Sequence, residues 1–317
     1  MKEFKTIDEQ INILKSRNIS FKNEIKAKNV LLNNNYYNII NGYNSLFLDN
    51  DKIHFKHVTT FEEIYALYDF DRQLRSIFLE YILKIENSLS SLVAYHFSKS
   101  YGHNNYLKLD NFETYVNIGA SIDKRRKQIK YIQMLIGNIN KKIASNIDTN
   151  YVNHYMTKYG FIPLWVLVNI LSFGELCNFY KLMKQRERIC VAKEFNISEI
   201  ELTSLLGILA KTRNLCAHDE RLYNYKFSTN VSINNTNYHK MLTIPSVNNR
   251  YTMGKNDLFA VVIALKILLT SNDYDRFHHK LFSRIMSIKS KLNTITLSDV
   301  LKSMNFPENW HNISKMS

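Results

Sequence analysis

The sequence predicts an all-α protein, a multi-helix bundle with helical extensions at both ends. Among its 317 residues only 8 are Gly and 3 are Pro, which is too few for the tight turns that sheet-rich folds need. Apolar residues recur at helical spacing along most of the chain, and several of these stretches begin with a capping residue. A chain of this length can bury a large core, and it shows no internal repeat. We therefore expect one compact helical unit.

The first part of the chain, residues 7–47, predicts two or three short helices with a break near residues 18–20. Its aromatic residues lie at a spacing that favours packing against the protein body over stacking on bases. They are Tyr36, Tyr37, Tyr43 and Phe47.

The longest helical signal runs from residue 60 to about residue 100. Thr60 and Glu63 form a capping-box pattern at its start, and Gly102 closes it. Beside the apolar stripe lies a second stripe that contains Arg72, Arg75 and Glu86. It is either a solvated flank of ion pairs or a surface that faces a site. The apolar stripe consists of Leu74, Phe78, Tyr81, Ile85, Leu89 and Leu92.

A strongly basic helix is predicted over residues 118–145. The formal charge of the whole chain is +14, which favours a polyanionic partner, nucleic acid ahead of a membrane surface. The alternative is a coding bias that raises the lysine count, since Asn, Ile and Tyr are also abundant. Four adjacent cations cover every side of a helix, so we expect part of them to be solvated and part to bind phosphate. They are Lys124, Arg125, Arg126 and Lys127.

Further capping signals divide the middle of the chain. Pro163 starts a short helix, and Ser172 with Glu175 caps the next one. Ser198 caps a helix that runs directly into the segment TRNLCAHDERLYN, residues 212–224. The region 225–255 is rich in Asn, Ser and Thr, and it predicts a functional loop or a small hairpin. Helices over residues 256–270 and 273–292 complete the chain.

The three cysteines, Cys177, Cys190 and Cys216, are few, far apart and without metal-binding spacing, so we expect reduced core side chains. The start of the chain is polar and the apolar runs, 161–173 and 258–269, are too short to span a bilayer. We expect a cytoplasmic protein without a membrane partner.

The segment 212–224 combines three groups that suit RNA chemistry. The guanidinium of Arg213 matches phosphate oxygens, and His218 can move a proton between oxygens. Asn214 lies four residues before His218 on the same helix face and can orient its ring. Such a set suits attack of a ribose 2′-hydroxyl on the adjacent phosphorus, and it calls for no metal or other cofactor. The alternative is a surface histidine that serves as a helix-terminal cation.

The residues RNLCAH, 213–218, resemble the Arg-x4-6-His signature of HEPN domains, which are helical RNA-cleaving modules. Further blocks resemble the Abi-like abortive-infection family of the AbiD and AbiF type: EQINILKSRNI, NYYNIINGY, FDRQLRSIFLEYILKIENSLSSLVAYHFSKSYG and PLWVLVNILSFGELCNFYKLM. These blocks follow the family's order over residues 8–225. The resemblance implies an endoribonuclease toxin of anti-phage defence, with a small noncoding RNA that restrains it.

Carried onto this chain, the resemblance implies catalytic roles for Arg213 and His218 and a supporting role for Asn214. Only one Arg-x4-6-His pair is present, so a homodimer with a shared site is implied. We expect RNA contacts from Arg72, Arg75, Arg221 and the four cations of the basic helix. The corresponding division is an N-terminal helical extension (1–60), a HEPN-like core (61–225) and a loop with C-terminal helices packed on it (226–317).

Two other functions remain open from the sequence. One is a non-catalytic protein that holds a small noncoding RNA, with His218 only packing or hydrogen-bonding. The other is a helical regulator that binds protein alone.

Overall fold

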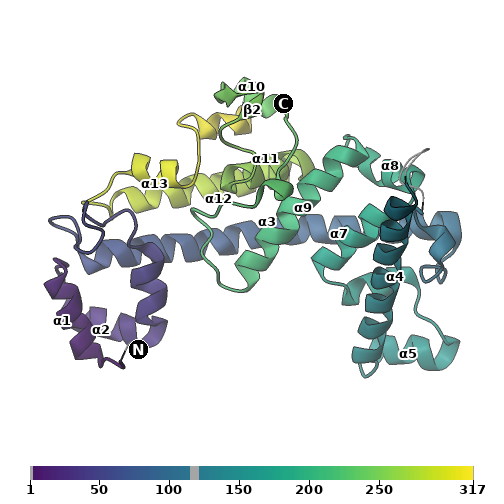
Figure 1. Cartoon of the computed structure of the whole chain (residues 1–317), viewed down its shortest axis with the longest axis horizontal. Coiled ribbons are helices and arrows are strands. Elements are labelled where there is room, and N and C mark those ends of the chain that lie inside the picture. Colours follow the sequence, from purple (N-terminus) through teal and green to yellow (C-terminus); the bar gives the residue numbers. More distant parts are fainter. Residues whose placement is uncertain (1–2, 115–120, 317) are drawn as a thin grey trace.

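The computed structural model describes residues 3–114 and 121–316 and confirms the all-α prediction (Figure 1). Thirteen α-helices and one short hairpin are present in this part of the chain. The longest helix, α3 (Phe61–Tyr101), runs through the molecule as its spine. None of the helices in the described ranges is long and apolar enough to cross a membrane.

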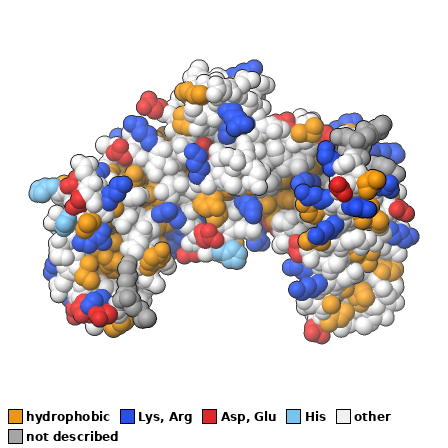
Figure 2. All heavy atoms as spheres, viewed as in Figure 1, with side chains coloured by type: hydrophobic (Ala, Val, Ile, Leu, Met, Phe, Trp, Pro, Cys, Tyr) orange, Lys and Arg blue, Asp and Glu red, His pale blue; other side chains and the backbone are white. Residues whose placement is uncertain are grey.

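The molecule has the form of an arch with an arm at each end of α3 (Figure 1). The N-terminal arm contains α1 (Ile7–Ser16), α2 (Glu24–Asn34) and the π-helical turn η1 (Tyr37–Asn41). The other arm contains α4 (Ile122–Ser145) and α5 (Asn150–Tyr159). Figure 2 shows a deep hollow between the two arms, under the middle of the arch.

The helices of the middle region pack around the second half of α3. The short turn η2 (Leu109–Asn111) precedes α4. The short segments α6 (Leu164–Leu167) and η3 (Val168–Ile170) lead into α7 (Phe173–Leu182), α8 (Gln185–Lys193) and α9 (Glu199–Ala217). The capping box of Ser172 and Glu175 forms as predicted, and α6 begins directly after Pro163. In Figure 1, α9 crosses α3 and its C-terminal end reaches the roof of the hollow.

The prediction for α3 is correct except at one residue. Thr60 caps the helix, Gly102 ends it with φ 85°, and the apolar stripe is buried apart from the half-buried Leu92. Glu63, however, does not close a capping box. Its carboxylate is buried and accepts hydrogen bonds from the backbone of residues 293–295 and from the Thr294 hydroxyl. The carboxylate therefore fixes a distant loop instead of the helix start, because that loop supplies more donors.

The N-terminal helices form where the sequence places them, with Asn18 in the left-handed region between α1 and α2. Tyr43 and Phe47 pack in the core as predicted. The prediction for Tyr37 is wrong, since its side chain is 68 % exposed. The π-helical turn η1 assigns the core positions to Ile39 and Ile40, and Tyr37 faces solvent.

The region 225–255 contains a small hairpin, one of the two predicted alternatives. Strands β1 (Ser246–Val247) and β2 (Arg250–Tyr251) pair around Asn248 and Asn249, which both have positive φ. This conformation is typical of a two-residue hairpin turn. The hairpin, η4 (Thr229–Val231) and α10 (Asn237–Met241) precede the C-terminal helices. In Figure 1 the hairpin and α10 lie at the outer edge of the arch, away from the hollow.

The C-terminal helices pack along α3 and complete the core. They are α11 (Leu258–Leu268), α12 (Ser271–Lys289), α13 (Leu297–Ser303) and the short η5 (Trp310–Lys315). Helix α11 is apolar on nearly all sides and almost entirely buried. The three cysteines are free, and burial raises the pKa of the Cys216 thiol to about 12. The boundaries proposed at residues 60 and 225 stay a prediction.

Candidate functional site

The motif of residues 213–218 forms the C-terminal end of α9. Ser198 caps this helix, and buried leucines at Leu202, Leu205 and Leu206 anchor it in the core. The helix ends at Ala217, and His218 is its C-cap. Asp219 follows with φ 57°, and the N–H of Glu220 donates to the carbonyl of Leu215 at 3.0 Å. The anchored helix therefore presents His218 at a defined, exposed end.

Arg213 is held against the spine helix by Glu86. Its Nε lies 3.6 Å from Oε2 of Glu86, and both atoms are buried without a hydrogen-bond partner among the described residues. Burial raises the pKa of Glu86, and the charge of Arg213 opposes that rise. The Arg213 side chain is still 30 % exposed. Its inner edge is thus neutralised by α3, while its outer part remains open to a ligand.

Asn214 and His218 are both exposed, one helical turn apart. The N–H of His218 donates to the carbonyl of Asn214 at 3.0 Å, so the helix is regular up to its cap. The structure therefore places Arg213, Asn214 and His218 together on the last turns of α9, with Asn214 and His218 exposed to solvent.

Arg75 has a different place from that expected for an RNA contact. It is 3 % exposed and forms an ion pair with Asp71, one turn away on α3, at 2.8 Å. Its second nitrogen binds the carboxylate of Asp219, the residue directly after His218. Because both ends of the guanidinium are occupied by carboxylates, Arg75 positions the end of the motif and does not offer a free cation to RNA.

Asp71 is the centre of this network, and sequence reasoning did not identify it. It is fully buried and accepts hydrogen bonds from the Tyr43 hydroxyl at 2.6 Å and from the backbone N–H groups of Leu222 and Tyr223. Burial raises the pKa of Asp71, whereas the Tyr43 hydroxyl and the Arg75 charge oppose the rise. The spacing of Asp71 and Arg75 at i and i+4 is the only local signal for the pair.

The segment after the motif is also tied to the N-terminal arm. The rings of Tyr43 and Tyr223 stack with centroids 5.7 Å apart. The guanidinium of Arg221 donates to the carbonyl of Gly42. Arg221 is exposed, as its predicted RNA-binding role requires, yet part of its hydrogen-bonding capacity serves this contact. Arm, spine and motif are thereby held as one unit.

A polar groove opens beside this segment. A cavity of about 570 Å³ lies between η1 and residues 219–226, and a second of about 620 Å³ continues along α2. The two share Asn38, Tyr68 and Asp219, so they are neighbouring parts of one groove. Other lining residues include Tyr37, Asn41, Arg221, Asn224, Lys226 and the asparagines 33–35. Exposed Tyr37 and these amides are groups that read and stack on unpaired bases.

The predicted cations of the basic helix lie on the other arm. Ser121 caps α4, and residues 118–120 of the predicted helix lie outside the described residues. Lys124, Arg125, Arg126 and Lys127 are all exposed, because the buried positions of α4 begin only at Ile132. Figure 2 shows Lys and Arg side chains gathered over this arm, including its side toward the hollow.

Arg72 lies on α3 one turn before Arg75. It is exposed and pairs with Asp69 at 2.7 Å. Arg221 thus follows the motif directly in sequence and Arg72 lies one turn from Arg75, the partner of Asp219, whereas the cations of α4 lie in the other arm (Figure 1). Within residues 3–114 and 121–316, no group of three or more His, Cys, Asp or Glu side chains is arranged to hold a metal ion.

Comparison with known protein families finds a match. The sequence model of a family described as Abi-like protein matches residues 29–224. This range contains η1, the spine helix, the Asp71 network and the whole motif at the end of α9. No curated protein and no solved structure matches the chain.

Proposed function

The chain belongs to the Abi-like family of abortive-infection proteins, and from this premise we propose that it is an endoribonuclease toxin of anti-phage defence. The proposed site is of the HEPN type, with Arg213 and His218 as catalytic residues and Asn214 in support. The observation that carries the proposal is that an anchored helix presents His218 at its exposed end, and that its last turns also carry an arginine whose inner edge is already neutralised.

The proposed reaction needs only side chains and the RNA itself. The ribose 2′-hydroxyl attacks the adjacent phosphorus, forming an O2′–P bond while the bond from phosphorus to the 5′-oxygen breaks. One histidine takes the proton of the 2′-hydroxyl, and another protonates the leaving 5′-oxygen. Arg213 stabilises the charge on the phosphate oxygens. The products are a 2′,3′-cyclic phosphate and a 5′-hydroxyl end.

This scheme requires two histidines, and each chain supplies one at its motif. We therefore propose a homodimer in which the α9 ends of two chains meet across a two-fold axis. One His218 then acts as base and the other as acid. The toxin would act on cytoplasmic RNA, with a small noncoding RNA as its restraint, and the groove beside η1 and the cations of α4 offer surfaces for both.

Cleavage of a mixed RNA pool in EDTA tests the proposal. Wild type should cut, and His218→Ala should be slower by roughly 10²- to 10⁴-fold because proton transfer is lost. His218 is exposed, so this change should alter stability by no more than about 0.5 kcal/mol. His279→Ala, at another exposed histidine, is the matched control and should cut like wild type. Equal cutting by wild type and His218→Ala would contradict the nuclease.

The second candidate function is a non-catalytic protein that holds RNA. The exposed cations of α4 and the amide-lined groove favour it independently of His218. In that case RNA binding persists while neither wild type nor variant cuts. A steep fall of RNA affinity with salt separates both RNA functions from a regulator that binds only protein, because phosphate contacts release counterions.

A further inference from the structure

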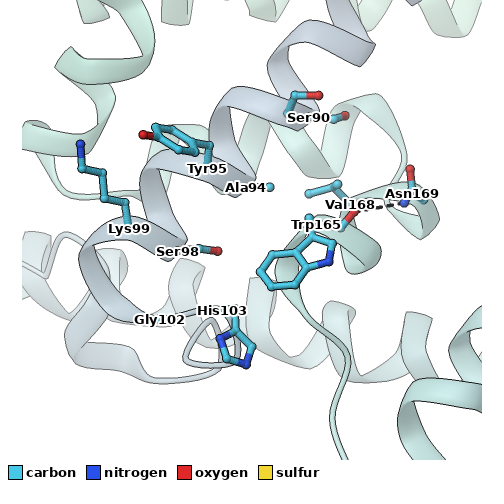
Figure 3. Close-up of a pocket in the computed structure, with 11 residues that line it drawn as sticks. Ser90, Ala94, Tyr95, Ser98, Lys99, Gly102, His103, Trp165, Val168 and Asn169 are labelled. Carbon is cyan, nitrogen blue, oxygen red and sulfur yellow. Dashed lines mark hydrogen bonds between the residues drawn. The ribbon is translucent and has the colours of Figure 1, made fainter. Parts of the chain in front are cut away.

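A pocket with an aromatic wall lies beyond the candidate active site, between the C-terminal half of α3 and the segment α6–η3 (Figure 3). Its volume is about 540 Å³, which is within the range of small-ligand pockets. Figure 3 shows Ala94 between Tyr95 and Trp165, with Val168 beside Trp165. The pocket is therefore apolar at its centre and flanked by rings.

The rings of this pocket are unusually exposed. Trp165 is 52 % exposed and Tyr95 is 60 % exposed. The ring of His103 lies 5.5 Å from the Trp165 ring and 5.2 Å from that of Phe161, which fixes one side of the wall. A tryptophan ring has a large apolar area. A ligand that covers the exposed ring of Trp165 would therefore gain the favourable free energy of burying that area.

The polar groups around the pocket suit a nucleotide. The hydroxyl oxygen of Ser98 is buried and has no hydrogen-bond partner among the described residues. Lys99 is one of the lining residues, and its ammonium lies 5.8 Å from the centroid of the Tyr95 ring. No carboxylate is among the described residues that line the pocket. Planar aromatic ligands with a nearby negative charge are therefore favoured over cationic ones.

The pocket is connected to the candidate active site through α3. Its lining begins at Ser90, whose hydroxyl donates to the carbonyl of Glu86 at 2.8 Å. Glu86 is the partner of Arg213. Ala94, near the centre of the pocket, lies eight residues beyond Glu86, which is about 12 Å along the helix. A strand bound at Arg213 needs only a few nucleotides to reach the pocket.

We propose that this pocket binds one unpaired base of the RNA strand that lies in the candidate active site. The base stacks on Trp165, and a neighbouring phosphate faces Lys99. Aromatic stacking does not depend on the identity of the base, so the pocket selects single-stranded over paired RNA. This inference rests on the proposed function for the identity of its ligand.

Tryptophan fluorescence tests the inference directly, since the chain has only two tryptophans and Trp310 is 3 % exposed. The probe is a single-stranded 2′-O-methyl oligoribonucleotide of about 12 nucleotides, which cannot be cut by 2′-hydroxyl attack. It should quench the emission of Trp165 in the Trp310→Phe protein. The same oligonucleotide in a duplex should cause little quenching.

Binding of variants supplies the second readout. Trp165→Ala should weaken binding of the single strand by about 5- to 100-fold, and Trp165→Phe should recover part of the loss. Tyr151→Ala removes an aromatic ring of similar exposure on α5, outside the pocket, and should bind like wild type.

The outcomes separate this inference from the nuclease proposal. Quenching without any His218-dependent cleavage supports the pocket and refutes the nuclease. Cleavage that depends on His218, with no quenching and with normal binding by Trp165→Ala, refutes the pocket and leaves the nuclease. A change of Trp165 emission that follows protein concentration in the absence of RNA would assign the ring to a contact between chains and also refute the pocket.

Discussion

Arg213 and Glu86 join α9 to α3 through two buried atoms at 3.6 Å. Because the pair uses only one edge of the guanidinium, Arg213 can have a structural role at its inner edge and a chemical role at its exposed part. Its inner edge compensates a carboxylate whose pKa is raised by burial. Its exposed part is the portion available to phosphate. Removal of Arg213 should therefore affect both stability and cleavage, and the two effects can be measured apart.

Arg213→Ala should destabilise the protein by roughly 1–3 kcal/mol at pH 7, because Glu86 is left charged, buried and without its cation. With Arg213 gone, the folded-state pKa of Glu86 rises further above its ordinary value of 4.5. The folded state then binds more protons than the unfolded state, so the free energy of unfolding falls as pH rises through this range. The loss should thus be smaller near pH 4.5 than at pH 7, as urea denaturation at the two pH values can measure.

Adding Glu86→Gln to Arg213→Ala is the matched test at this position. The double variant should regain most of the stability at pH 7, because no uncompensated charge remains. RNA cleavage should stay as low as in the single variant. If stability and cleavage return together, Arg213 acts only as a structural partner of Glu86.

At the scale of elements, Asp71 links three parts of the fold. Its carboxylate binds Arg75 on the same helix, Tyr43 from the N-terminal arm, and the backbone of residues 222 and 223 after the motif. Arg75 in turn holds Asp219. The position of His218 therefore depends on an interaction centred on α3 and not on α9 alone.

Asp71→Ala should lower the free energy of unfolding by about 3–5 kcal/mol, because it leaves Arg75 and two backbone donors buried without an acceptor. Asp69→Ala, two residues earlier, removes the partially exposed pair with Arg72 and the hydrogen bond from the Gln73 side chain, but leaves no buried cation uncompensated, and should cost only about 1 kcal/mol. Chemical denaturation of both variants measures the difference. Equal, small losses would show that the Asp71 network does not hold the segment.

At the scale of the whole molecule, the arch places the end of α9 at the roof of a hollow between two arms (Figures 1 and 2). The N-terminal arm contributes the polar groove, and the other arm contributes the exposed cations of α4. The motif lies between these two surfaces (Figure 1). The shape thus agrees with a site that receives RNA and a second chain at the middle of the arch.

Mixing subunits tests the shared site. Excess His218→Ala added to a fixed amount of wild type should lower the cleavage rate, because mixed dimers contain only one catalytic histidine. RNA is kept in excess so that the inactive variant does not compete for substrate. Adding His279→Ala instead should raise the rate in proportion to total protein. A rate that is unaffected by excess His218→Ala would show that each chain cuts alone.

The sequence by itself determined most of the helices, their caps at Thr60, Ser172 and Ser198, and the position of the motif at the end of α9. These features depend on residues within a few positions of each other, so local spacing is sufficient to predict them. The family resemblance was also readable, since its blocks are continuous stretches of chain.

Only the tertiary structure decided which polar side chains are buried. Arg75 meets Asp219 across 144 residues of chain, and Glu63 meets the hydroxyl of Thr294 across 231. The spacing within one helix cannot reveal such partners, because burial and charge compensation depend on segments that fold back from far along the chain. For the same reason, Tyr37 and Trp165 became exposed rings beside cavities only when neighbouring elements were in place.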